Sequence, residues 1–238
     1  MIWVLAVIMI LPPFAIDSTN NQKIYAGSFY GGVYVSADGG STWSTNSQTT
    51  NSIFQIIVDP DDTDEIYAAG ENGFYISTDG GANWSPSGAI SGSILDLAQS
   101  ASSHDILYAM AGSTSNYELY KSADRGTSWS NLGHTNIDPQ KIAVDPSDSD
   151  TIYLATSSSS AYKSTDGGVS ISQANTGLPS NPTTIWRIQT DGSNLFAVTR
   201  SGLFKSSDGG INWQVLKSLS GITRGVFSES KRWEDLRT

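Results

Sequence analysis

The chain has 238 residues, enough for one all-β domain, and its 13 basic and 23 acidic residues give a formal net charge of −10. This charge disfavours nucleic acid or anionic lipid as the main partner, because phosphate binding rests on clustered Lys and Arg. The chain contains no cysteine, which excludes disulfides, thiolate metal sites and a cysteine nucleophile.

The first eleven residues, MIWVLAVIMIL, are apolar without interruption. They are fewer than the roughly 20 residues that a membrane span needs, and they match the apolar region of a secretory signal. No Lys or Arg precedes them and no clear cleavage site follows before Ala15, so a buried strand is the alternative. We expect an exported protein, secreted or at the cell surface.

Repeated segments each predict four short β-strands. The first strand ends near an Asp or Ser, and a tyrosine of the second strand follows eight positions later, as in Asp17 and Tyr25. The further pairs are Asp59 and Tyr67, Ser100 and Tyr108, and Asp145 and Tyr153. The first two strands are almost continuously apolar, as expected when neighbouring sheets cover both faces. The sequence therefore predicts an all-β fold of small antiparallel sheets packed around an axis, with each first strand innermost.

A short motif, Ser-x-Asp-x-Gly-x-x-aromatic, lies between the third and fourth predicted strands. It begins at residues 36, 77, 122, 164 and 206. Its aspartate can accept hydrogen bonds from the backbone of its own turn, its glycine supplies positive φ, and its aromatic ring gives the return strand a packing anchor. The motif residues are Asp38, Trp43, Asp79, Trp84, Asp124, Trp129, Asp166, Asp208 and Trp213, with Ile171 at the aromatic position of the fourth copy.

This motif resembles the Asp-box, or BNR, repeat of sialidase-like, xyloglucanase-like and sortilin-like β-propellers. The resemblance covers residues 12–220, and five copies in register make it specific. It implies a β-propeller of four-stranded antiparallel blades, with five Asp-box blades and a partial sixth. It also implies that the boxes are structural and lie away from the ligand-binding face.

The blade boundaries follow from the motif positions. The predicted blades are 12–46, 52–87, 93–131, 140–174 and 184–217. Residues 221–228, GITRGVFS, resemble the first strand of a sixth blade, but no second strand or box follows them. We therefore divide the chain into the apolar segment 1–11, the propeller 12–220 and a partial sixth blade or appendage 221–238. Either five blades close a ring, or the chain is part of a larger propeller or assembly.

Candidate ligand-binding residues come from the loops on the face opposite the boxes. Phe29, Tyr30, Tyr117 and Trp186 offer flat faces for sugar rings or peptide side chains, although they could equally cover blade edges. The polar candidates from these loops and from the links between blades are Glu71, His134 and Arg200.

A set of polar residues occupies equivalent positions in four first strands. Each of them stands four residues before the Asp or Ser position near the end of its strand, among mostly apolar neighbours. They are Gln55, Asp96, Lys141 and Arg187. We predict that they form a polar ring at the mouth of the central channel, with Asp96 paired to Lys141 or Arg187. The alternative is that they only solvate strand ends and satisfy one another.

Two acidic loops allow a calcium site. DPDDTDE at 59–65 and DPSDSD at 145–150 carry aspartates that could supply oxygen ligands. Neither has the glycine and distal glutamate of an EF-hand loop, and the first repeat has STNNQ at this place, so a polar turn is sufficient. We predict no cofactor, with calcium as the alternative.

The sequence gives little support for a catalytic function. Resemblance to sialidases would imply three arginines that grip a carboxylate, but no arginine precedes Arg125 and the N-terminal arginine motif is absent. A xyloglucanase-like hydrolase needs two carboxylates across a cleft, and the acids outside the boxes and turns lack flanking residues of a hydrolase motif. These acids are Glu71, Asp96, Glu118 and Asp138. His104 and His134 have no nucleophile elbow near them.

The sequence thus favours a non-catalytic binding or scaffold module for a glycan or a protein. Two alternatives remain open: a self-assembling building block of an extracellular array, and a glycoside hydrolase or a fragment of one.

Overall fold

In the described part of the chain, twenty strands form five antiparallel sheets, each with four strands in sequence order. The computed structural model describes residues 13–45, 48–49, 51–87, 90, 92–113, 116–134, 137, 139–156, 160–179, 185–199 and 201–218. The first two sheets contain β1 (Phe14–Ile16), β2 (Ile24–Ser28), β3 (Gly32–Ser36), β4 (Ser44–Thr45), β5 (Ile53–Val58), β6 (Ile66–Gly70), β7 (Gly73–Ser77) and β8 (Ser85–Ser87). The third and fourth contain β9 (Ile94–Gln99), β10 (Leu107–Ser113), β11 (Asn116–Ser122), β12 (Ser130–His134), β13 (Pro139–Asp145), β14 (Asp148–Thr156), β15 (Ala161–Ser164) and β16 (Ser172–Gln173). The fifth contains β17 (Ile185–Thr190), β18 (Leu195–Thr199), β19 (Gly202–Ser206) and β20 (Gln214–Ser218).

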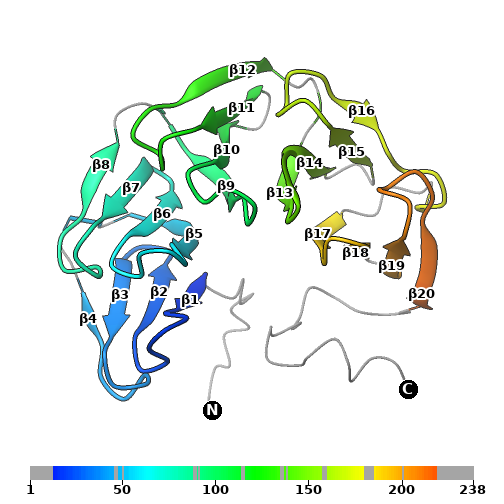
Figure 1. The fold of residues 1–238 in the computed structure, drawn as a ribbon. Helices are drawn as coiled ribbons and strands as arrows, with labels where there is room; N and C mark the ends of the chain where they lie inside the picture. Colours follow the sequence, from blue (N-terminus) through cyan, green and yellow to red (C-terminus); the bar gives the residue numbers. More distant parts are fainter. Residues whose placement is uncertain are drawn as a thin grey trace, which may run out of the picture.

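The five sheets fan out around a common axis (Figure 1). The first strands β1, β5, β9, β13 and β17 lie nearest the axis, and the fourth strands lie at the periphery. This is the arrangement of a β-propeller, so the predicted fold class and the innermost first strand are confirmed. The first and fifth sheets stand apart in the described part of the chain (Figure 1). The predicted segment 1–11 and partial sixth blade 221–238 lie outside the described residues.

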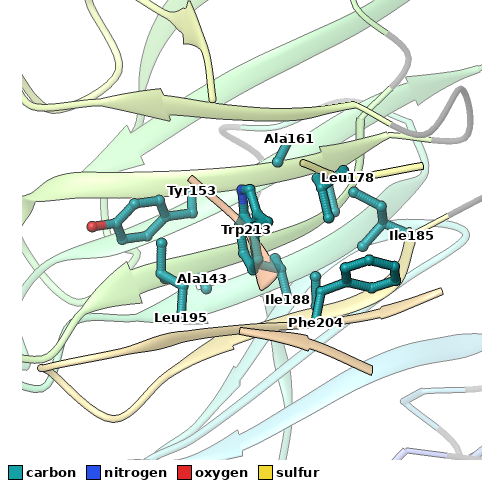
Figure 2. Close-up of a cluster of buried hydrophobic side chains, with 11 residues drawn as sticks. Ala143, Tyr153, Ala161, Leu178, Ile185, Ile188, Leu195, Phe204 and Trp213 are labelled. Carbon is teal, nitrogen blue, oxygen red and sulfur yellow. The ribbon is translucent and has the colours of Figure 1, made fainter. Parts of the chain in front are cut away.

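The core lies between the sheets and consists of four clusters of buried side chains, one for each pair of successive sheets. Between the fourth and fifth sheets, Ala143 and Tyr153 pack against Ile188, Leu195 and Trp213 (Figure 2). Because a sheet within the fan buries both faces, successive residues of its second strand can all be buried, as in IYAAG of β6.

Each Asp box is a hydrogen-bonded turn between the third and fourth strands. In all five boxes the serine Oγ donates to the aspartate Oδ1 at 2.7–2.9 Å. The same Oγ accepts the N–H of the second glycine of the turn at 2.8–2.9 Å. The residue before the aromatic position donates its N–H to Oδ1 at 2.8 Å and its side chain to Oδ2 at 2.5–2.8 Å. The serine and the aspartate side chains therefore together accept the backbone N–H groups of the corner.

The box also contacts the preceding sheet. Gly81 has a φ of +86°, and a Cβ placed on it would lie 3.0 Å from the ring of Tyr25 and from Val35. Tyr25 in turn donates its hydroxyl to the carbonyl of Gly80 at 3.2 Å. Glycine is thus required both for the turn and for the close approach of two sheets.

The aromatic residues of the boxes differ in burial. The indoles of Trp84 and Trp213 are buried, and Ile171 packs in the cluster between the third and fourth sheets. Trp43, by contrast, is 44% exposed. The reason is that no sheet precedes the first one in the described structure.

We predict that Trp84→Ala destabilises the protein by roughly 3–5 kcal/mol, because the indole is only 3% exposed and its removal leaves a cavity between two sheets. Trp43→Ala is the matched control and should cost clearly less. Equilibrium urea unfolding measures both variants. Equal losses would contradict the different roles of the two rings.

Because of the box carboxylates, the stability of the fold should depend on pH in the acidic range. Hydrogen bonds from the Thr42 side chain and from the Ser170 side chain hold the pKa values of Asp38 and Asp166 at about 2, and the pKa values of Asp79, Asp124 and Asp208 are also lowered. A lowered pKa stabilises the fold above the unfolded value of 3.8, and this stabilisation is lost as the pH falls towards 2.

We therefore expect Asp166→Asn to lower the urea midpoint at pH 6, with a difference from the parent that shrinks between pH 4 and about pH 2. A difference that stays constant over this range would show that the charge of Asp166 does not contribute.

Candidate functional site

The first strands enclose a channel of about 430 Å³ at the centre of the fan. Its walls come from β5, β9, β13 and β17, and it contains the polar positions singled out in the sequence: Gln55, Asp96, Lys141 and Arg187. These residues lie near the starts of their strands. The boxes lie at the opposite end, beside the loops between first and second strands, as the hydrogen bond from Gly80 N to Asp64 O shows. The four polar residues therefore lie near the channel mouth away from the boxes.

A β-bulge precedes each of these polar residues. The register of β5 with β6 shifts between Ile53 and Gln55, and equivalent shifts occur in the other three first strands. The residues at the extra position are Phe54, Leu95, Gln140 and Trp186. A bulge inserts a residue into the pairing and re-aims the neighbouring side chains. This is how polar side chains enter strands whose other residues pack between sheets.

Asp96 and Lys141 form the predicted ion pair. Lys141 Nζ lies 2.8 Å from Asp96 Oδ1, and the backbone N–H of Ile142 donates to Asp96 Oδ2 at 2.8 Å. Asp96 is buried, whereas Lys141 is half-buried. The carboxylate thus connects β9 to β13 across the boundary between two sheets.

Arg187 gives the same end of the channel a second cation. Its side chain is exposed, and in the amide orientation that satisfies both groups the Gln189 carbonyl oxygen accepts from Arg187 Nε at 3.2 Å and from its terminal nitrogen at 3.0 Å. Among the described residues that line the channel, Lys141 and Arg187 bring two positive charges and Asp96 one negative charge. The channel therefore carries an excess of positive charge in a protein whose net charge is −10.

An aromatic patch lies at the boundary between the first two sheets and consists of Phe29, Tyr30 and Phe54. The Phe29 ring centroid is 6.1 Å from that of Phe54 and 6.4 Å from that of Tyr30. Ser52 Oγ contacts both the Phe29 carbonyl and Glu71 Oε2, so the Glu71 carboxylate lies beside the patch. Phe29, Tyr30 and Glu71 were predicted, whereas Phe54 was missed because it occupies the bulge position of an otherwise buried strand.

The other candidates are dispersed. Tyr117 lies on β11 and is half-buried. His134 ends β12 and Trp186 lies on β17, but their side chains lie outside the described part of the structure, as does Arg200. The structure thus brings together Asp96, Lys141 and Arg187 in one site and Phe29, Tyr30 and Glu71 in another.

Glu118 belongs to a local network on the third sheet. Its Oε2 accepts from the hydroxyl of Tyr120 and, at 3.0 Å, from the amide nitrogen of Asn131. Burial, together with the hydrogen bond to Glu118, raises the pKa of Tyr120 to about 12. This carboxylate is committed to one contact within β11 and one across to β12 of its own sheet. Asp138 lies outside the described residues.

Arg125 lies against the acidic loop at 59–65. Its Nε is 2.7 Å from Asp105 Oδ1 and its Nη1 is 3.0 Å from Glu65 Oε2, while Asp59 and Asp61 lie at 3.7 and 3.6 Å. The hydrogen bonds to Asp105 and Glu65 raise the pKa of Arg125 further. Asp59, Asp61 and His104 bring possible metal ligands within 4.8 Å of one another. The guanidinium of Arg125 therefore lies beside two of these three residues, Asp59 and Asp61.

Arg125 also has unusual backbone geometry. Its φ is +57° in a position that is glycine in the other four boxes, and it is the non-glycine residue with positive φ in the described structure. The left-handed conformation costs an ordinary residue roughly 1 kcal/mol, and the ion pairs of the guanidinium offset this cost.

No helix in the described part of the chain is long and apolar enough to cross a membrane.

Comparison with known proteins identifies the motif and the fold. Residues 75–86 match the family model of the BNR/Asp-box repeat. No curated protein sequence matches the chain.

Solved structures with the same fold include enzymes and binding proteins. The GH74 xyloglucanase from Xanthomonas campestris is 16% identical with a TM-score of 0.70, over 90% of this chain and 38% of that chain. YCF48 bound to D1 peptide is 17% identical with a TM-score of 0.60. The match covers 82% of this chain and 63% of the YCF48 chain. The nidogen/laminin complex contains a chain that is 13% identical with a TM-score of 0.60. The match covers 82% of this chain and 75% of that chain. The chain spans about a third of the GH74 enzymes that it matches, between 32% and 38% of their length.

We predict that Asp96→Ala destabilises the protein by roughly 1–3 kcal/mol, because it leaves the Ile142 N–H and Lys141 without their buried acceptor. Gln55→Ala, at the equivalent position of β5, is the control and should have a smaller effect.

A double-mutant cycle with Lys141→Ala measures the interaction energy of the Asp96–Lys141 pair. We expect a coupling energy near the lower end of the roughly 0.5–3 kcal/mol range, because solvent screens the half-exposed amine. Additive losses would contradict a coupled pair.

Proposed function

We propose that this Asp-box β-propeller is an exported, non-catalytic binding module that takes an acidic protein segment at the channel mouth away from the boxes. The observation that carries this proposal is the excess of positive charge at one end of the channel. Lys141 and Arg187 lie there, and Asp96, the one carboxylate among the described residues that line the channel, is paired with Lys141. An acidic segment would complement these cations, and a carboxylate can accept two parallel hydrogen bonds from an arginine.

The state of the carboxylates supports a binding role over hydrolysis. A glycosidase needs one acid that donates a proton and a second carboxylate across the cleft. Asp96 is held by Lys141 and by a backbone N–H, and Glu118 is held by Tyr120 and Asn131. Groups fixed in this way are poor candidates for proton transfer to a substrate.

The relatives support the same class of function. YCF48 has been solved with a bound peptide, and the nidogen structure is a complex with laminin, so propellers of this fold bind peptides and proteins. By analogy, we assign a peptide or protein partner to this chain.

A second candidate function is glycan binding at the aromatic patch. Phe29 and Tyr30 are exposed, and Glu71 lies beside them as a hydrogen-bond acceptor. Exposed aromatic rings with a neighbouring acceptor suit the apolar face and hydroxyl groups of a sugar ring.

Calorimetric titration should distinguish the two candidates. We expect an acidic hexapeptide of alternating Asp and Glu to bind, with an affinity that falls as salt rises, and a Lys hexapeptide not to bind. Arg187→Ala should weaken binding about tenfold, which corresponds to the loss of one charged hydrogen bond. Lys23→Ala, which removes a cation on the box side, is the matched control.

Absence of acidic-peptide binding would refute the channel proposal. Binding of a xyloglucan oligosaccharide that is abolished by Tyr30→Ala would support the second candidate instead. Release of reducing sugar from xyloglucan would contradict a non-catalytic role.

A further inference from the structure

Two carboxylates and an imidazole meet at the box end of the boundary between the second and third sheets, which are neighbours in the fan (Figure 1). Asp59 and Asp61 belong to the loop between β5 and β6, and His104 belongs to the loop between β9 and β10. One ligand atom from each residue lies within 4.8 Å of the others, and Asp61 Oδ2 is 2.7 Å from His104 Nδ1. Loops of two different sheets thus bring oxygen and nitrogen ligands to one place.

Asp61 departs from the pattern of the equivalent loops. In the first loop Thr19 Oγ1 donates to Asp17 Oδ1 at 2.7 Å, and in the fourth Ser147 Oγ donates to Asp145 Oδ1 at 2.7 Å. The second loop has a carboxylate at this position, and an ionised carboxylate has no proton to donate. Its charge lies beside the imidazole of the next sheet instead. The side chain of Asp61 is therefore not explained by the turn.

Asp59 is buried and held in a fixed orientation. Its Oδ2 accepts from the Tyr67 hydroxyl at 3.1 Å and from the Gln99 amide at 2.8 Å. Gln99 also donates to the carbonyl of His104 at 2.8 Å, so one amide positions both loops. Carboxylates that bind metals are commonly oriented by such hydrogen bonds. Oδ1 accepts two N–H groups of its own loop, at 2.8 and 3.3 Å, and a metal would replace the longer bond.

The charges around Arg125 leave this place negative. The guanidinium hydrogen bonds go to Asp105 and Glu65, at 2.7 and 3.0 Å, whereas Asp59 and Asp61 lie 3.7 and 3.6 Å away. Four carboxylates therefore lie within 4 Å of one guanidinium, which is an excess of three negative charges. A divalent cation would offset most of this excess and leave both short hydrogen bonds of Arg125 in place.

We propose that Asp59, Asp61 and His104 bind a zinc ion that ties the second sheet to the third. Zinc accepts imidazole and carboxylate ligands at about 2.0–2.2 Å in a tetrahedral arrangement, which leaves the fourth position for water. Calcium takes oxygen ligands, so the imidazole selects against the calcium that the acidic loop alone would allow. Asp61 and His104 have partly exposed side chains, at 56% and 23%, and can rotate to close the coordination sphere.

Calorimetric titration of Zn²⁺ into the metal-free full chain tests the site, and we expect one ion per chain. Asp61→Ser installs the hydroxyl that equivalent loops carry, and His104→Asn installs the amide found at this position of the first loop. Each should weaken binding about a hundredfold or more, because each removes one ligand. His134→Ala removes the other histidine of the chain and should bind zinc like the parent.

Arg125→Gly gives an effect of the opposite sign. It restores the glycine of the other four boxes and removes a positive charge beside Asp59 and Asp61, so zinc should bind about tenfold more tightly. Zinc should also raise the urea midpoint of the parent and leave that of Asp61→Ser unchanged, because the ion joins two sheets.

Four outcomes would overturn the proposal. The parent could fail to bind zinc, Asp61→Ser and His104→Asn could bind it like the parent, His134→Ala could abolish binding, or calcium in about hundredfold excess could displace the zinc. Circular dichroism must show that the variants are folded, and if one is not, the other decides. The titration uses no peptide and concerns the box end, so its failure would leave the function proposed for the opposite mouth unaffected.

Discussion

The contact between the box of one sheet and the side chains of the preceding sheet organises the molecule. At the first boundary, the Tyr25 ring lies against Gly81 and its hydroxyl binds the Gly80 carbonyl. The positive φ of the glycine closes the turn, and its missing side chain lets the ring approach. Turn formation and sheet packing therefore depend on the same residue. At the second boundary Phe74 lies against Gly126, and the Tyr67 hydroxyl donates to Asp59 of its own sheet.

This constraint acts on only one end of the sheets. The box end is fixed by the hydrogen bonds of the aspartate corner and by contacts between sheets. The other end is free of these requirements, and there the first strands contain bulges. A bulge interrupts the apolar alternation without disturbing the rest of the strand. Polar side chains such as Asp96 and Lys141 can thus enter the channel while Ile142, next in the chain, remains in the core.

The sequence predicted the repeat and the blades, and it predicted that Asp96 pairs with Lys141 or Arg187. These predictions follow from register, because equivalent positions of neighbouring sheets meet around an axis. The structure shows the pair with Lys141. It could not predict features that break the register. Phe54 occupies an inserted bulge position, which periodicity does not mark. Arg125 replaces a box glycine, and its pairing with Asp105 and Glu65 appears only when two loops are brought together. The exposure of Trp43 depends on a neighbouring sheet, which the motif itself does not specify.

The distribution of charge gives the two ends of the channel different properties. All five box aspartates and the acidic loop at 59–65 lie at one end, where turns and ion pairs use them. Lys141 and Arg187 lie near the other mouth. At the box end the carboxylates are engaged by turn N–H groups and by cations such as Lys23 and Arg125. At the other mouth Asp96 pairs with Lys141, and Arg187 adds a further positive charge. The acidic segment proposed above would be favoured at that mouth, because local charge rather than net charge decides where a charged partner approaches.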